Sequence, residues 1–232
     1  MLRAAPAGLF FTADLFLWHE SIALVGPGLA TILVNLQVIV LGVAGFLVFK
    51  ERVTWRFYAG IACIVPGVWL LVGMGSGAGA DGFGKGVVYG LLAAVAYAGF
   101  VLSMRTTQSA EDSPAPSVNL AYASIWTGLG TAVLALVTGA TDFLFVPSPR
   151  VALLLIAYGV VCQAFGWLLI TRAAPNLPAA LVGVFLLLQP ALAFVWDVAF
   201  FGRTTAWSDV VGLTAVLVGV FFASFRKAPT AT

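Results

Sequence analysis

The feature that most constrains this chain is a series of eight long apolar runs, each about the length of a membrane-spanning helix. At about 1.5 Å per residue, roughly 20 residues cover the hydrocarbon core of a bilayer, which is about 30 Å thick. The runs occupy residues 7–24, 28–49, 55–73, 84–104, 118–138, 150–171, 178–201 and 207–225. Short segments with turn residues, such as Gly26-Pro27-Gly28, separate them. The sequence therefore predicts an all-α polytopic membrane protein with about eight transmembrane helices.

Composition excludes several other classes of protein. Of the 232 residues, 62% are hydrophobic and only 9% are charged, whereas the surface of a soluble domain needs roughly a quarter charged residues. A formal net charge of +2 without a cluster of Lys or Arg gives no reason to expect a nucleic-acid partner. Cys63 and Cys162 lie far apart inside apolar runs, so the sequence indicates neither a disulfide framework nor a metal site.

The distribution of basic residues predicts the orientation in the membrane. Asp14, His19 and Glu20 interrupt the first run, which argues against a cleaved signal peptide, so the first run counts as a span. With the N-terminus inside, eight basic residues fall on the inner side: Arg3, Lys50, Arg52, Arg56, Arg105, Arg172, Arg226 and Lys227. Only three fall on the outer side: Lys85, Arg150 and Arg203. The positive-inside rule therefore predicts that both termini are cytoplasmic.

An internal repeat appears when the chain is compared with itself at an offset of 152 residues. This register aligns Gln37 with Gln189, Trp55 with Trp207, Gly60 with Gly212 and Gly67 with Gly219. Corresponding helices are separated by five predicted spans, which is an odd number, so the two copies face opposite ways in the membrane. Inverted repeats of this kind are typical of secondary transporters.

The two copies differ in size. Residues 84–138 have no counterpart in the first copy, so the chain holds three helices of one repeat and five of the other. We expect a partial first repeat at residues 1–73, an outer linker at 74–83, a second repeat at 84–227 and a cytoplasmic tail at 228–232. Either the protein is natively eight-helical, or two helices are missing from its N-terminus.

Several motifs resemble the EamA-like branch of the drug/metabolite transporter superfamily. They are Asp14-Leu15 and Trp18-His19, the run from Ala30 to Gln37, and Glu51-Arg52 before Trp55. The resemblance implies ten helices in two inverted halves, both termini cytoplasmic, and transport of small metabolites or drugs, often outward. The match begins at the third helix of the family, so the first two helices are absent here.

Two acidic residues, Asp14 and Asp197, lie inside predicted spans. A charge in the middle of a span costs about 2.5–3.5 kcal/mol, so such residues need partners or a water-filled cavity. Asp14 shares a helical stripe with Trp18 and Ser21. Both acids are candidates for proton coupling or for binding the amine of a substrate, and the alternative is structural hydrogen bonding between helices. The single histidine, His19, fits an ordinary interfacial position.

Amide and aromatic side chains complete the candidate substrate pathway, because a mostly apolar pocket needs a few orienting polar groups. Gln163 and Trp167 are spaced i, i+4, and Gln189 and Trp196 share a face of one helix. The full set of candidates is Asp14, Trp18, Asn35, Gln37, Gln163, Trp167, Gln189, Trp196 and Asp197. Hydrogen bonding between helices is the alternative role for each amide.

The sequence predicts a secondary transporter of small organic metabolites or drugs in the inner (plasma) membrane, exporting by alternating access, with proton coupling as an open option. The P-loop, HExxH and GxSxG motifs are missing, so we expect no enzyme, cofactor or metal. An intramembrane enzyme would require Asp14 and Asp197 to meet across helices. The other alternative is a truncated, inactive fragment or an accessory membrane subunit. The expected partners are the substrate and the bilayer, and the oligomeric state is open.

Overall fold

A computed structural model describes residues 2–50, 54–74, 79–109, 112, 114–139, 148–166, 169 and 179–224, with the backbone alone at 49, 163 and 179–186. A short 3-10 helix at Leu2–Ala4 leads into α1 (Ala5–Asn35), which is followed by α2 (Gln37–Phe49), α3 (Trp55–Gly73), α4 (Phe83–Gln108) and α5 (Pro116–Thr138). Next come α6 (Pro149–Ala157), a π-helix at Tyr158–Phe165, α8 (Ala179–Phe201) and α9 (Trp207–Ser224). The described part of the chain holds no strand, so the predicted all-α class is confirmed.

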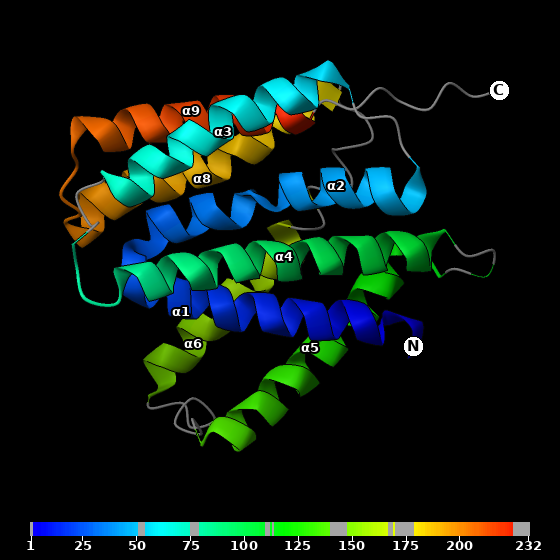
Figure 1. Ribbon diagram of the computed structural model, residues 1–232. Helices are drawn as coiled ribbons and strands as arrows, with labels where there is room; N and C mark the ends of the chain where they lie inside the picture. The colour runs from blue at the N-terminus through cyan, green and yellow to red at the C-terminus, as the bar shows by residue number, and fades with distance from the viewer. Residues whose placement is uncertain are drawn as a thin grey trace.

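α1 is a helical hairpin rather than one long rod. Gly26 has a φ of 83° and a ψ of 159°, which interrupts the helix, and Pro27 starts the second leg. A positive φ favours glycine, and proline is well suited to the first turn of a helix. Figure 1 shows the blue ribbon running away from the N-terminus and then returning toward it through α2. The turn predicted at Gly26-Pro27-Gly28 is therefore present.

Five helical stretches are long and apolar enough to cross a membrane: Leu2–Val48, Trp55–Gly73, Phe83–Gln108, Pro116–Thr138 and Trp207–Ser224. The break at Gly26 divides the first of them into two legs. Two shorter apolar helices occupy Pro149–Cys162 and Leu187–Phe201. Helical segments thus stand where the sequence predicts spans, and the chain is a polytopic membrane protein.

The two ends of the helix bundle differ in what they carry. We call the end that holds Leu2 and the C-terminus of α4 the terminal end, because in Figure 1 the ribbon of α1 begins there and that of α9 runs toward it. There the Thr107 hydroxyl donates to the carbonyl oxygen of Arg3 (3.2 Å). The opposite end, which we call the hairpin end, holds the end of α3, the beginnings of α4 and α9 and the end of α8 (Figure 1), and the turn at Gly26 lies there beside Asp197. At this end the Ser208 hydroxyl donates to the carbonyl oxygen of Met74 (2.9 Å).

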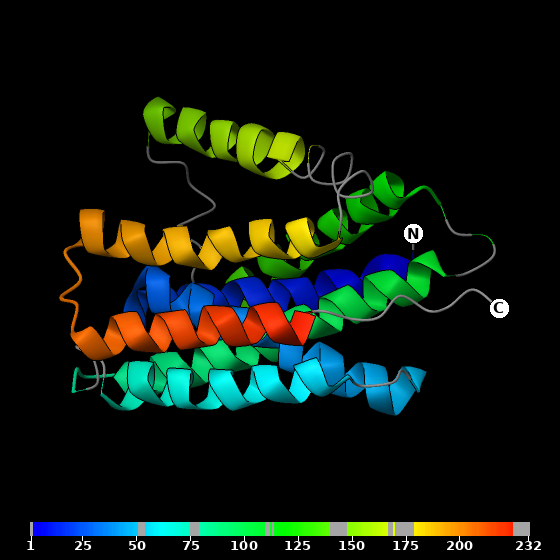
Figure 2. The same ribbon diagram turned by 90° about the horizontal axis from the view of Figure 1, so that it is seen from above.

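α3 and α9 pack side by side through glycines (Figures 1 and 2). A Cβ atom added to Gly60 would lie 2.5 Å from the carbonyl oxygen of Gly219, and one on Gly67 would lie 2.9 Å from that of Gly212. The two helices are antiparallel, since the contacts pair 60 with 219 and 67 with 212. Without side chains at these positions, the two backbones approach closely.

Each of the two glycine contacts joins a glycine of one repeat to a glycine of the other, and the repeat relates the two contacts to each other. The 152-residue register equates Gly60 with Gly212 and Gly67 with Gly219, and the structure joins them crosswise. A two-fold relation between two copies produces this pattern, because each contact occurs twice with the partners exchanged. The pseudo-axis passes between Ile64 and Val216, which are each 1% exposed. It lies across two antiparallel helices, which is the geometry of an inverted repeat in a membrane.

The helices pack around two clusters of buried residues. The larger cluster joins the α1 hairpin, α3 and α9, and its fully buried members include Leu29, Leu33 and Leu71. A smaller cluster of Ala7, Phe100 and Ala123 joins the first leg of α1 to α4 and α5. α6 lies to one side of the bundle in Figure 2, and none of its residues is buried. The bundle therefore positions the acids of α1 and α8 inside protein.

Candidate functional site

Asp14 lies in the middle of the first leg of α1 and is 4% exposed. Its Oδ1 atom has no hydrogen-bond partner. One turn further along, the Nε1 atom of Trp18 is also buried without a partner, whereas Ser21 donates to the carbonyl oxygen of Gly86 in α4 (2.8 Å). The predicted stripe thus exists, and two of its three polar groups have hydrogen-bonding capacity that the described residues leave unused.

The amide candidates of the second leg behave differently from each other. Asn35 donates through Nδ2 to the carbonyl oxygen of Thr31 (2.8 Å), one turn back on its own helix. Gln37 has a buried Oε1 atom without a hydrogen-bond partner. Gln37 therefore resembles Asp14 and Trp18 in its unused polar capacity, while the Nδ2 group of Asn35 is satisfied within its own helix.

Of the candidates on the later helices, Gln189 and Trp196 do not lie with the buried acids. Gln189 and Trp196 are exposed on α8, and Trp196 packs on Phe200 with ring centroids 5.2 Å apart. Gln163 lies in the π-helix, but its side chain is outside the described residues, as is the whole of Trp167. The structure thus brings neither Gln189 nor Trp196 to Asp197, which is 3% exposed.

Asp197 is surrounded by partners at the hairpin end. Its Oδ2 atom accepts a hydrogen bond from the backbone N–H of Gly28 (3.0 Å) and lies 3.4 Å from Nη1 of Arg203. A Cβ atom added to Gly26 would lie 2.7 Å from the same oxygen. Glycines at the hairpin turn therefore leave the space that the carboxylate occupies.

Arg203 links the carboxylate of Asp197 to that of Asp209. Neither Arg203 nor Asp209 was among the candidates from the sequence. The Nη1 atom of Arg203 donates to the carbonyl oxygen of Val25 (3.0 Å), and its Nη2 atom lies 3.8 Å from Oδ1 of Asp209. The guanidinium also lies 5.3 Å from the centre of the Phe194 ring. We call the side chains of Asp197, Arg203 and Asp209 the Arg203 cluster.

A local sequence signal for Asp209 does exist. It is the third residue of α9, and its Oδ2 atom accepts a hydrogen bond from the backbone N–H of Ala206, the residue just before the helix (2.8 Å). An acid at this position commonly reaches back to the helix start. Asp209 is completely buried. The groups that compensate its charge are this N–H group and Arg203.

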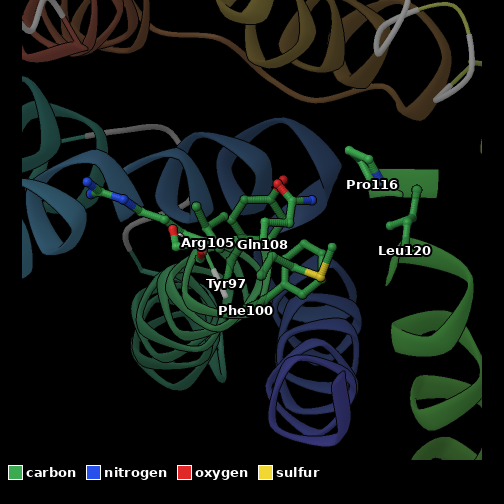
Figure 3. A pocket seen from close by; sticks show the side chains of 9 residues that line it. Tyr97, Phe100, Arg105, Gln108, Pro116 and Leu120 are labelled. Atoms are coloured by element: carbon green, nitrogen blue, oxygen red, sulfur yellow. Dashed lines mark hydrogen bonds between the residues drawn. The ribbon is translucent and has the colours of Figure 1, made fainter. Parts of the chain in front are cut away.

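Two cavities lie at the terminal end. The first, of about 430 Å³, is lined by Tyr97, Phe100, Val101, Met104, Arg105, Gln108, Ser109, Pro116 and Leu120. Figure 3 shows Pro116 and Leu120 of α5 facing the aromatic residues of α4, with Arg105 extending away from them. The second, of about 350 Å³, is lined by Leu2, Arg3, Ala4, Thr107, Asp112, Pro114, Asn119 and Tyr122. The mainly apolar first cavity is suited to an apolar or aromatic solute.

The two buried acids do not form a catalytic pair. Asp197 contacts Gly28 at the hairpin turn, whereas Asp14 precedes the turn at Gly26 by 12 residues. At 1.5 Å per residue this places them about 18 Å apart along the helix axis. Among the described residues, no group of His, Cys, Asp and Glu side chains could hold a metal ion. The geometry therefore supports separate roles for the two acids.

A polytopic bundle of apolar helices with reciprocal packing between inverted repeats is the arrangement typical of secondary transporters. The sequence model of the EamA-like transporter family matches residues 1–73 and 84–225. The chain belongs to the EamA-like transporter family, as its motifs predicted, and its members are transporters of the drug/metabolite transporter type. A comparison with curated proteins finds no match.

Proposed function

We propose that this protein exports small organic metabolites or drugs across the inner membrane by alternating access, with a proton as the coupling ion. The single observation that carries this proposal is the buried, unpartnered Oδ1 atom of Asp14. An isolated charge is costly inside a membrane, so such a carboxyl group must bind a proton or a cation when it is enclosed. Exchange of that ligand between the two sides is how a carboxyl group couples transport to a gradient.

Two further polar groups without partners support the proposed substrate binding. Trp18 follows it by one turn, and both Nε1 of Trp18 and Oε1 of Gln37 are buried without partners. A donor and an acceptor of this kind, within otherwise apolar helices, would orient a small solute that carries complementary polar groups. We propose Asp14, Trp18 and Gln37 as the substrate-facing residues, and we assign Asn35 and Asp197 to the structure of the bundle.

The orientation of the chain completes the proposal. Eight of the eleven basic residues fall on the side of the predicted cytoplasmic termini. The terminal end is therefore the cytoplasmic end, and the hairpin end faces outward. A reporter enzyme fused after Thr232, active only in one compartment, should show cytoplasmic activity. Periplasmic activity would reverse the assignment.

The test of function is transport in proteoliposomes, with a panel of labelled amino acids, nucleobases and aromatic amines, with and without an imposed pH gradient. The wild-type protein should move at least one solute faster with the gradient. Asp14→Asn should reduce gradient-driven movement at least tenfold, because an amide of similar shape cannot release a proton. Glu20→Gln is the matched control on the same helix and should keep wild-type rates.

The alternative, a truncated or accessory protein, makes a different prediction in the same assay. Folded wild-type protein would then move no solute under either condition. If transport is equally fast in wild type and Asp14→Asn, the protein is a transporter but Asp14 has no coupling role.

A further inference from the structure

We propose that the Arg203 cluster closes one of the two gates of this transporter, and that breaking it is the step that opens the hairpin end. The inference rests on the alternating-access mechanism proposed above. It concerns Asp197, Arg203 and Asp209, which have no part in the proposed substrate or proton binding.

The contacts of the cluster join three segments of the chain at one point. Arg203, in the segment between α8 and α9, donates to the carbonyl oxygen of Val25, which is the last residue of the first leg of α1. Asp197 of α8 accepts from the N–H of Gly28, in the second leg. The two bonds lie on either side of Gly26, so one leg of the hairpin tip is bonded to the segment that follows α8 and the other leg to α8 itself. The tip cannot separate from α8 while both bonds persist.

The burial of the cluster suits it to a gate that can be either closed or open. The side chains of Arg203, Asp197 and Asp209 are 9%, 4% and 0% exposed, respectively. While the gate is closed, the single positive charge of Arg203 faces both carboxylates out of water, and the N–H groups of Gly28 and Ala206 stabilise the remaining negative charge. When it opens, each charge regains its hydration, which offsets the lost ion pairs. An apolar contact of the same size would lose its stabilisation on opening without this compensation, so a charged cluster lowers the difference between the two states.

The internal repeat does not place the same three side chains in the first copy. The 152-residue register places Gly45, Glu51 and Phe57 at the positions of Asp197, Arg203 and Asp209. Gly45 and Phe57 are uncharged, and Phe57 is buried beside Gly42 in the apolar core. The repeat is therefore symmetric in its helices but not in this charge cluster, and the same ion pairs cannot form at the terminal end.

The cavities agree with this asymmetry. Both cavities described above lie at the terminal end, whereas the cluster holds the hairpin end together. Among the described residues, this distribution fits a conformer that is closed at the hairpin end. The Arg203 cluster accounts for that preference, because it stabilises only this closure.

The test measures access to each end separately. In a Cys63→Ala, Cys162→Ala background, one protein carries Val25→Cys beside the cluster, and a second carries Val101→Cys in the first cavity. Val25 is 7% exposed, so we expect slow labelling there by a charged, membrane-impermeant maleimide. Both proteins are placed in nanodiscs, where the reagent reaches both faces, and the rates are compared with and without Arg203→Gln.

A gate and a merely structural cluster give opposite results in this assay. If the cluster is a gate, Arg203→Gln raises the rate at Val25→Cys at least tenfold and lowers the rate at Val101→Cys, because opening one end closes the other. Arg203→Lys should fall between Gln and wild type, and Arg150→Gln, an arginine elsewhere on the predicted outer side, should change neither rate. Faster labelling at both positions, or unchanged labelling at both, overturns the proposal.

The assay requires no substrate, so its outcome is independent of the transport experiment. A chain that moves no solute but shows the opposed change in labelling would keep the gate and lose the proposed transport function. A chain that transports normally but shows no opposed change would keep the function and lose the gate.

Discussion

Two buried carboxylates, Asp14 and Asp197, occupy similarly dry positions and yet have opposite surroundings. They are 4% and 3% exposed, respectively. Asp197 accepts from Gly28 and faces Arg203, while the Oδ1 atom of Asp14 has no partner among the described residues. Burial alone therefore does not distinguish the acid that we propose as the proton carrier from the acid that we assign to the structure of the bundle. The difference lies in whether the protein itself compensates the charge.

The largest loss of stability should come from removing Arg203, the partner of Asp197. Arg203→Ala leaves Asp197 and Asp209 buried without their shared cation, which costs about 3–5 kcal/mol when a buried pair is broken. We expect a lower free energy of unfolding of that size, measured by denaturant titration in mixed micelles. Arg150→Ala is the exposed control and should differ from wild type by less than about 0.5 kcal/mol. Equal effects of the two substitutions would refute the compensating role of Arg203.

Exchanging each acid for its amide should change the free energy of unfolding in different directions for Asp14 and Asp197. Asp197→Asn loses a charged acceptor of a hydrogen bond and an ion pair, so we expect a loss of about 2–3 kcal/mol. Asp14→Asn removes a carboxyl group that lacks a partner, so the protein should be as stable as wild type or more stable. The same unfolding titration measures both. A similar loss in both variants would mean that Asp14 also has a compensating partner.

Filling the space around Asp197 should cause a smaller loss of stability. In Gly28→Ala, the new Cβ atom would lie 2.9 Å from Oδ2 of Asp197 and 2.9 Å from the Cα atom of Phe194. Overpacking of this kind costs about 1–2 kcal/mol when part of the strain can relax. Gly84→Ala provides the matched control, since nothing lies within 4 Å of its Cβ position. Its stability should equal or exceed that of wild type, and a penalty as large as that of Gly28→Ala would contradict the packing argument.

The smallest effect belongs to the stripe that contains Asp14. Ser21→Ala removes one hydrogen bond, from the hydroxyl to the carbonyl oxygen of Gly86. That carbonyl lies within helix α4, so the expected loss of stability is about 0.5–1.5 kcal/mol. Gradient-driven transport by this variant should persist, because Ser21 already has a partner and Asp14 is untouched. Loss of coupling in Ser21→Ala would extend the functional site along the stripe.

Most of the fold could be predicted from the sequence. Long apolar runs and the Gly26-Pro27 break indicate the helices, because a bilayer requires every spanning backbone to be hydrogen-bonded internally. The glycine register at 152 residues likewise predicted the inverted repeat, which the crosswise contacts of Gly60 and Gly67 display in three dimensions.

The candidate site could be predicted only in part. Asp14 stands out in a sequence because an acid within an apolar run is rare. Gln189 and Trp196 proved to be exposed, because in a helix that is apolar all round the sequence does not separate faces that meet lipid from faces that meet protein. Arg203 and Asp209 were missed although Arg203 is only six residues from each acid in the sequence, because the Val25 carbonyl group that Arg203 contacts comes from a distant segment and meets it only in the folded bundle.

The crosswise glycine contacts between α3 and α9 have a consequence for how substitutions combine. Gly60 and Gly219 share one contact, and Gly67 and Gly212 share another about 10 Å away, seven residues along the helix. Once alanine at Gly60 has forced the two backbones apart at the first contact, alanine at Gly219 meets space that is already open. Double variants within a contact should therefore cost less than the sum of the single ones, while variants from different contacts should add. Four glycines thus behave as two thermodynamic units, and the internal symmetry of the chain becomes measurable as a pattern of coupling energies.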